Sequence, residues 1–201
     1  MARIAIIGTG RMASGLAAGW SKAGHSVVLG SRQPEGKTSS GAVVTGQVAA
    51  LDGAEVVVLA MPYAAVEPFA RAQAATLRVK VVIDISNPFD RLPDNRTSGA
   101  EVTAAAIGHG AKVIAAFKGN FAATLGQPID SSGVVRDVHF AGDDEGAKAL
   151  GAQLIRDLGF RPIDCGAMKN ARVLDGMVPL MIELDRRHGT GAASVSWKLL
   201  P

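Results

Sequence analysis

Three small residues near the N-terminus have the spacing of a phosphate-binding loop. Gly8, Gly10 and Ala13 match the pattern G-x-G-x-x-G/A directly after the apolar run Ile4–Ile7. In such loops the first glycine allows a tight turn, the second lets the backbone approach a pyrophosphate, and the third small residue lets the helix pack closely. The helix N-terminus then offers free N–H groups and a partial positive charge to the phosphates. The pattern predicts dinucleotide binding; the alternative is a glycine turn that only joins a strand to a helix.

The end of the second predicted strand, Val27–Leu29, carries the residues that should select the cofactor. NAD enzymes place an Asp or Glu here, about 20 residues beyond the glycines, to bind the ribose 2′-hydroxyl. This chain has Ser31 and Arg32 instead, and its first carboxylate is Glu35. A serine hydroxyl and a planar guanidinium suit a 2′-phosphate, and Lys37 could add a third contact. The pattern favours NADP(H) over NAD(H); the alternative is a solvated turn.

Two later strand ends should complete the cofactor crevice. Ala60-Met61-Pro62 closes a predicted strand over 56–60, and Ser86-Asn87-Pro88 follows one over 81–85. Ligands of doubly wound sheets bind outside the carboxyl ends of the strands. Small residues and a proline-fixed backbone would let a nicotinamide ribose and ring approach, and Asn87 could hold the carboxamide or the substrate. The alternative is a pair of ordinary strand-to-helix turns.

The sequence shows no constellation of catalytic or metal-binding side chains. The single cysteine, Cys165, excludes an internal disulfide and a Cys-rich zinc site. No Ser–His–Asp pattern occurs either, so we expect neither a catalytic acid or base nor a metal. Tyr63, directly after Pro62, and His109, between two glycines, are the nearest candidates for a proton donor. Packing is the simpler expectation for Tyr63.

Apolar runs and helical patterns alternate along the whole chain. This alternation predicts an α/β protein with a doubly wound, mostly parallel sheet, a Rossmann NADP-binding fold, and a short C-terminal helix region. No repeat or linker divides residues 1–201, which we expect to form a single dinucleotide-binding domain. The loops within 85–135 and the segment 168–201 should build the substrate side. The apolar face of a terminal helix over 168–187 should pack in the core or form a dimer surface; it consists of Val173, Met177, Leu180 and Leu184.

Composition excludes several classes of protein. Of 201 residues, 48% are hydrophobic and 19% charged, which excludes a disordered chain. The net charge is +3, no basic run occurs and aromatics are only 4%, so nucleic-acid binding is not expected. The longest apolar stretch, 56–66, contains Pro62 and is shorter than the roughly 18 residues of a membrane span. The N-terminus is too short for a signal sequence, so we expect a cytoplasmic protein that binds no membrane.

Four of these segments together resemble the NADP-dependent coenzyme F420 reductases. Those are small dinucleotide-binding proteins of the 6-phosphogluconate-dehydrogenase-like superfamily. The segments are Gly8-Thr9-Gly10-Arg11-Met12, Gly30-Ser31-Arg32, Ala60-Met61-Pro62 and Ser86-Asn87-Pro88. The resemblance continues more loosely to Trp197-Lys198-Leu199 and covers nearly the whole chain. It implies that Thr9, Arg11, Met12, Ser31 and Arg32 contact NADP and that Ala60, Met61 and Pro62 lie near the nicotinamide ribose.

One segment departs from the family pattern. Many relatives have an Ala-Phe-Asn-Thr-like segment where this chain has Ala116-Phe117-Lys118-Gly119-Asn120. We expect this altered loop to lie near the substrate side.

The resemblance implies hydride transfer between NADP(H) and a deazaflavin, with coenzyme F420 or a flavin as co-substrate. We also expect the protein to form a homodimer. In such a transfer the protein mainly holds the two rings in reach of each other and excludes water. Two alternatives remain. One is NADPH-dependent reduction of a small imine or carbonyl; the other is a non-enzymatic NADP(H) sensor that changes partners on binding.

Overall fold

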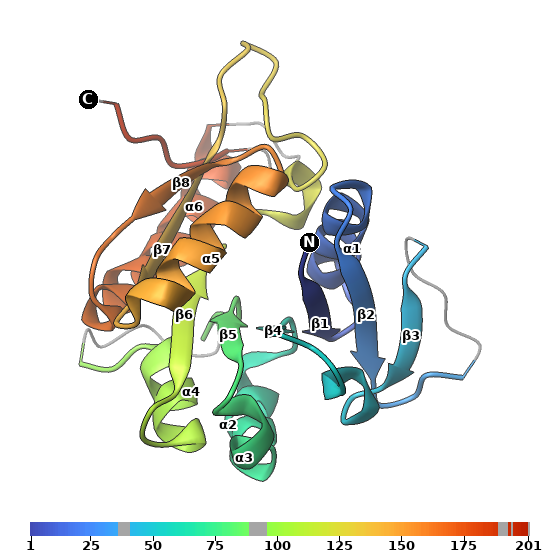
Figure 1. Ribbon diagram of the computed structural model, residues 1–201. Coiled ribbons are helices and arrows are strands. Elements are labelled where there is room, and N and C mark those ends of the chain that lie inside the picture. Colours follow the sequence, from blue (N-terminus) through green and yellow to red (C-terminus); the bar gives the residue numbers. More distant parts are fainter. Residues whose placement is uncertain (36–40, 89–95, 189–192, 194, 201) are drawn as a thin grey trace.

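In the computed structural model, eight strands of the described chain form one sheet with helices on both faces (Figure 1). The structure describes residues 1–35, 41–88, 96–188, 193 and 195–200. The strand order is β3-β2-β1-β4-β5-β6-β7-β8. The strands are β1 (Arg3–Ile7), β2 (Ser26–Ser31), β3 (Val43–Gly46), β4 (Val56–Leu59), β5 (Val81–Asp84), β6 (Lys112–Ala116), β7 (Asp137–Gly142) and β8 (Arg161–Asp164).

Two helical layers cover the sheet. Helices α1 (Arg11–Lys22) and α5 (Glu145–Asp157) pack on one face, where Trp20 contributes a fully buried side chain. The other face is covered by α2 (Tyr63–Ala72), α3 (Ala74–Leu77), α4 (Gly99–Ile107) and α6 (Ala171–Arg187). Three short 3-10 turns complete the described elements: η1 (Ala49–Leu51), η2 (Ala122–Thr124) and η3 (Met168–Asn170).

Strand β1 shows why the sheet needs both layers. Ile4 and Ile6 belong to one hydrophobic core and Ala5 and Ile7 to the other, because successive side chains of a strand point to opposite faces. A continuous apolar run is the pattern of a parallel strand buried on both faces. The predicted α/β, doubly wound and mostly parallel sheet is therefore confirmed.

The reversal at β7 was not predicted. Strand β7 runs antiparallel to β6, whereas every other neighbouring pair is parallel. The segment between them contains only η2 and an isolated bridge from Ile129 to Val135. Parallel strands require a crossover, usually a helix, and this segment has no such helix.

Two predicted helices differ from the observed ones. The residue pattern over 64–77 predicts one helix, whereas the structure has two, α2 and α3, which meet at Gln73. The sequence predicts a short helix around Val102–Ile107, but α4 already begins at Gly99, because Ser98 and Glu101 form a capping box. In that box the Ser98 side chain accepts a hydrogen bond from the Glu101 N–H, and the Glu101 carboxylate accepts one from the Ser98 N–H.

The prediction that the apolar face of the terminal helix packs in the core is wrong for Val173 and Leu180, whereas Met177 does pack against the core. Val173 and Leu180 are 62% and 51% exposed, whereas Leu174, Asp175 and Val178 are buried. The prediction failed because it counted only apolar residues, and a buried aspartate with partners lies on the inner face. The alternative expectation, a dimer surface, stays a prediction.

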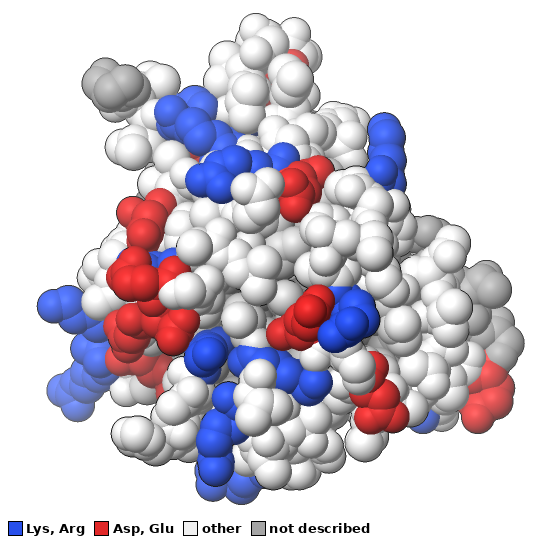
Figure 2. All heavy atoms as spheres, viewed as in Figure 1, with Lys and Arg blue, Asp and Glu red and all other residues white. Residues whose placement is uncertain are grey.

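Two further expectations concern the distribution of surface charge and the presence of membrane-spanning helices. On the face shown in Figure 2, acidic and basic side chains lie interspersed over several elements. Among the described helices, none is long and apolar enough to cross a membrane.

Candidate active site

The glycine loop lies where the order of the strands changes direction. Strand β1 pairs with β2 on one side and with β4 on the other, so the crevice at its carboxyl end is a topological switch point. Gly8 follows β1 with a φ of +137°, and its N–H donates to the Gly30 carbonyl at 2.9 Å. A Cβ at Gly8 would lie 2.1 Å from the carbonyl oxygen of Ala60. Only glycine therefore fits between the ends of β2 and β4.

Gly10 has the opposite surroundings. It is the N-cap of α1 with an extended backbone (φ −76°, ψ −177°), and no side chain caps this helix. A Cβ at Gly10 would meet nothing within 4 Å, whereas Ala13, the third motif residue, is fully buried. The space beside Gly10, at the uncapped N-terminus of α1, is therefore open, as a pyrophosphate site requires.

The end of β2 lies beside this loop. Ile7 of β1 is in register with Gly30 of β2, so Ser31 and Arg32 come next to the start of the glycine loop. Ser31 is buried, and its Oγ both donates to the Gln33 carbonyl and accepts from the Gln33 N–H. This turn leaves Arg32 exposed. The Arg32 guanidinium is thus accessible to a 2′-phosphate, while Lys37 lies outside the described residues.

A cavity of about 550 Å³ adjoins the glycine loop. Six of the predicted site residues line it: Arg11, Met12, Ala60, Met61, Pro62 and Asn87. Thr9, Ser31 and Arg32 do not line it, and Pro88 is buried. The remaining lining residues are Tyr63, Ala64, Ile85, Ser86, Phe117, Lys118, Asn120, Phe121, Ala122, Val178 and Met181.

The far wall of the cavity was not predicted residue by residue. Phe117, Phe121, Val178 and Met181 form an apolar wall from the loop after β6 and from α6. The sequence placed the substrate side within the 85–135 loops and the segment 168–201, which contain these four residues, but within those ranges it singled out only the departure from the family pattern at Lys118. Phe117 adopts a left-handed backbone (φ +56°), which is uncommon for a bulky residue and turns the chain at the end of β6.

Asn87 presents an unsatisfied acceptor at the cavity. Its Nδ2 lies 3.4 Å from the Lys118 carbonyl oxygen, to which it donates. Its Oδ1 is buried and has no hydrogen-bond partner among the described residues. A buried polar atom without a partner is costly and uncommon in proteins. Asn87 therefore fits a ligand that donates a hydrogen bond, such as the amide of a nicotinamide.

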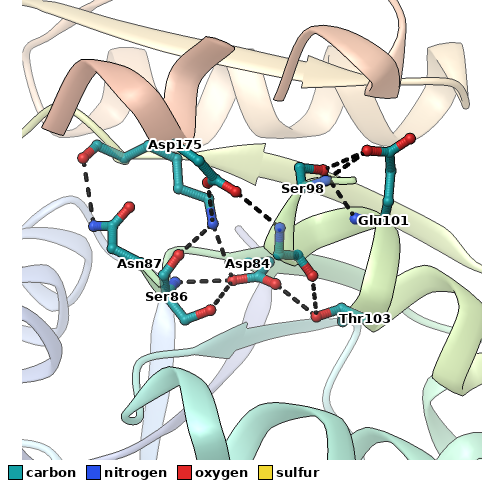
Figure 3. Close-up of polar contacts among 9 residues, drawn as sticks. Asp84, Ser86, Asn87, Ser98, Glu101, Thr103 and Asp175 are labelled. Atoms are coloured by element: carbon teal, nitrogen blue, oxygen red, sulfur yellow. Dashed lines mark hydrogen bonds and ion pairs between the residues drawn. The ribbon is translucent and has the colours of Figure 1, made fainter. Parts of the chain in front are cut away.

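Lys118 forms a buried charged cluster with Asp84 and Asp175, and Figure 3 shows the polar contacts around these two aspartates. Its Nζ is 3.2 Å from Asp175 Oδ1 and 3.5 Å from Asp84 Oδ1, and it also donates to the Ser86 carbonyl. Lys118, Asp84 and Asp175 are all at most 2% exposed. A buried ammonium of this kind requires such partners.

The two aspartates have further donors around them. Asp84 accepts hydrogen bonds from the N–H and hydroxyl of Ser86 and from the hydroxyl of Thr103. Asp175 accepts one from the N–H of Gly99 at 2.8 Å, where α4 begins. The cluster therefore joins β5, the loop after β6, α4 and α6.

The other titratable candidates contribute little to the cavity. Tyr63 lines it, whereas His109 is exposed in the turn after α4 and is not part of the lining. Burial lowers the pKa of His139 and raises the pKa of the Cys165 thiol; neither residue lines the cavity. Among the described residues, no group of three or more His, Cys, Asp and Glu side chains could hold a metal ion.

A second cavity, of about 490 Å³, lies on the exposed side of α6. It is lined by Val173, Gly176, Met177 and Leu180, with Trp197, Lys169, Asn170 and Arg172 around them. None of the predicted cofactor residues contributes to it.

The similarity of this chain to known proteins agrees with the predicted dinucleotide-binding motifs and with the fold. A family described as "NADP oxidoreductase coenzyme F420-dependent" matches residues 3–88. The "F420-dependent NADP reductase" of Methanothermobacter thermautotrophicus is 31% identical over 99% of this chain and 96% of its own length. A crystal structure from Arthrobacter sp. FB24, described as a candidate F420-dependent NADP reductase, covers both chains completely with a TM-score of 0.89 and 26% identity.

More distant structures share the fold alone. An imine reductase from Streptomyces aurantiacus has a TM-score of 0.67 at 18% identity over 90% of this chain and 60% of its own. The full-length similarity to the reductases shows the family directly. The chain belongs to the F420-dependent NADP oxidoreductase family.

Proposed function

We propose that this protein transfers a hydride between NADP(H) and coenzyme F420. The observation that carries the proposal is the continuous cavity of about 550 Å³, which runs from the start of α1 to an apolar wall on α6. The proposal is supported by the full-length similarity to proteins named F420-dependent NADP reductase. When bound, NADP(H) supplies or accepts the hydride at C4 of its nicotinamide.

The cofactor half of the site has a role for each of its elements. The open N-terminus of α1 at Gly10 would bind the pyrophosphate, and Arg32 would bind the 2′-phosphate. Asn87 Oδ1 would accept a hydrogen bond from the carboxamide and so orient the ring. Each of these groups is in place before the cofactor arrives, so little ordering is needed on binding.

The acceptor half is apolar and aromatic. Phe117, Phe121, Val178 and Met181 would hold a second planar ring against the nicotinamide and exclude water from between the two. Positioning of this kind lowers the barrier without an acid or base, because the hydride passes directly from ring to ring. The substrate is therefore a small molecule with a flat, reducible ring system.

A panel of acceptors tests the proposal. Turnover of NADPH is measured with F420, FMN, riboflavin, a small imine and a small carbonyl, each over a range of concentrations. We expect F420 to have the highest kcat/KM by at least about tenfold. A higher kcat/KM for the imine or carbonyl would overturn the proposal.

Reduction of an imine or carbonyl is the second candidate, because Tyr63 lines the cavity beside Pro62. Hydride addition to a carbonyl forms an alkoxide that must be protonated, and an imine must be protonated to accept the hydride. Tyr63, with its hydroxyl, would be the proton donor.

Removal of the tyrosine hydroxyl separates the two candidates. Under the proposed function, Tyr63→Phe and His109→Ala should each change kcat by less than about tenfold, well under the roughly 10²–10⁴-fold of general acid–base catalysis. Steady-state kinetics with the best acceptor measures this. A fall of three or more orders of magnitude in either variant would favour the imine or carbonyl reaction.

A further inference from the structure

We propose that Lys118 is a positioning residue, which holds Asn87 in the orientation that receives the nicotinamide carboxamide. This inference rests on the proposed function. It concerns the one residue of the far wall that departs from the family pattern and carries a charge. The contacts of Lys118 with Ser86, Asn87 and the two aspartates carry the inference.

The ammonium of Lys118 is directed at protein acceptors and not at a substrate. It is surrounded by three acceptors: the Ser86 carbonyl, Asp84 Oδ1 at 3.5 Å and Asp175 Oδ1 at 3.2 Å. A lysine ammonium has three donors, and three acceptors surround it here: two accept hydrogen bonds, and Asp175 forms an ion pair. Lys118 therefore acts through its neighbours rather than as a proton donor.

Both aspartates hold the lysine side chain in place. Asp84 receives hydrogen bonds from Ser86 and Thr103 in addition to the ammonium. Asp175 accepts a hydrogen bond from the N–H of Gly99 and forms an ion pair with the ammonium through Oδ1. The two carboxylates thus anchor the lysine side chain on opposite sides.

Lys118 meets the Ser86-Asn87 segment at two points. Its ammonium binds the carbonyl of Ser86, which belongs to the peptide bond that precedes Asn87. Its own carbonyl accepts a hydrogen bond from Asn87 Nδ2 at 3.4 Å. Together these contacts fix the backbone and the amide plane of Asn87, and they leave Oδ1 as its unpartnered atom. Lys118 therefore determines how the unpartnered Oδ1 of Asn87 is oriented.

The same ammonium ties the cavity wall on α6 to the sheet. Asp175 is on α6 one turn before Val178 and two turns before Met181, both of which line the cavity. A change at Lys118 should therefore affect the nicotinamide end of the site and leave the adenosine end, at Arg32, as it is.

The test compares ligands with and without a nicotinamide. NADPH and adenosine 2′,5′-bisphosphate are titrated calorimetrically into the full-length protein and into Asn87→Ala and Lys118→Met. Loss of one well-placed hydrogen bond should weaken NADPH about two- to tenfold in either variant, while the bisphosphate affinity stays within about twofold. The double variant should bind NADPH no more weakly than Lys118→Met alone, because both changes act on one contact.

Hydride stereochemistry provides a second readout. With NADPH deuterated on one or the other C4 face, the unaltered protein should transfer from one face only. Lys118→Met should transfer from both, because an unheld carboxamide lets the ring turn over. Lys118→Arg, which keeps a cation with several donors, should retain more facial selectivity than Lys118→Met.

Lys148→Met is the matched control. Lys148 is also buried and also pairs with two carboxylates, Glu145 at 2.8 Å and Asp164 at 3.2 Å, but it does not line the cavity. Its loss should change neither the NADPH affinity nor the facial selectivity. If Lys118→Met does not fold, Asp175→Asn carries the test, since it removes one of the three anchors and should show the same selective loss for NADPH.

Two outcomes for Lys118→Met, or for Asp175→Asn in its place, would overturn the inference. In the first, the variant binds both ligands more weakly by the same factor. In the second, it binds both as tightly as the unaltered protein and still transfers from one face only. Failure of the proposed function has a different signature. In that case the unaltered protein itself would fail to bind NADPH more tightly than the bisphosphate or to transfer its deuterium.

Discussion

Gly10→Val is expected to fold as the unaltered protein does and to bind NADPH at least about a hundredfold more weakly. The folded backbone at Gly10 is extended, with a φ of −76°, and a Cβ would meet nothing within 4 Å. Valine is therefore compatible with the fold. The same empty space is where the pyrophosphate should approach the N-terminus of α1, and a branched side chain there would occupy it. A hundredfold loss corresponds to about 2.7 kcal/mol of binding free energy.

Fluorescence titration with NADPH measures the loss, and thermal unfolding checks the fold. Gly126→Val is a suitable control, because Gly126 is exposed, has no positive φ, and a Cβ there would also meet nothing within 4 Å. Gly8 offers no such test, since a Cβ there would lie 2.1 Å from the Ala60 carbonyl oxygen and disturb the fold itself. Normal NADPH binding by Gly10→Val would mean that the loop is only a turn.

Arg32→Ala should weaken NADPH about ten- to hundredfold and leave NADH almost unchanged. The end of β2 has no carboxylate for a ribose 2′-hydroxyl, and Arg32 is exposed beside the glycine loop. A hydrogen bond to a charged group contributes about 1.5–3 kcal/mol, which corresponds to this range of affinities. The 2′-phosphate is the one group that distinguishes the two cofactors, so the effect should be confined to NADPH.

Parallel titrations of both cofactors measure this selectivity. Arg3→Ala provides the control, because Arg3 is an exposed arginine at the opposite, amino end of β1 and pairs with Glu55. It should change neither affinity by more than about twofold. An equal loss of NADPH and NADH in Arg32→Ala would contradict the assignment of Arg32 to the 2′-phosphate.

The parts of the fold that follow local rules could be predicted from the sequence. The run Ile4–Ile7 is buried on both faces, and Gly8 has the positive φ that the motif requires. Helix α5 begins after Asp144, whose carboxylate accepts a hydrogen bond from the Ala147 N–H, as its residue type suggests. These features depend on residues that are close together in the sequence, so the local sequence pattern is enough to predict them.

Features that depend on distant partners could not be predicted in this way. The direction of β7 depends on the missing crossover helix between it and β6. The inner face of α6 contains Asp175, which is buried because Lys118 and Gly99 reach it from other elements. Hydrophobic periodicity assigns such a residue to solvent, and the exposed Val173 and Leu180 were placed on the wrong side for that reason.

The candidate site likewise has one part that local motifs predict and one part that depends on distant contacts. The predicted residues Arg11, Met12, Ala60, Met61, Pro62 and Asn87 come together around one cavity, because parallel strands end at a common edge. The far wall combines a loop after β6 with α6, and no motif links the two. Lys118 was notable in the sequence only as a departure from relatives, and its role depends on three acceptors from β5, α6 and the loop after β5.

The most direct test of hydride transfer follows the hydrogen itself from one ring to the other. The protein is incubated with coenzyme F420 and NADPH that carries deuterium on the transferred C4 face, and the reduced deazaflavin is analysed by mass spectrometry and NMR. The account predicts one deuterium on the acceptor's ring carbon for each NADPH oxidised, because the reaction involves no exchange with water. Two results would contradict the account. One is reduced F420 that carries no deuterium at that carbon, whichever C4 face of NADPH was labelled. The other is a protein that does not reduce F420 but readily reduces an imine or a carbonyl.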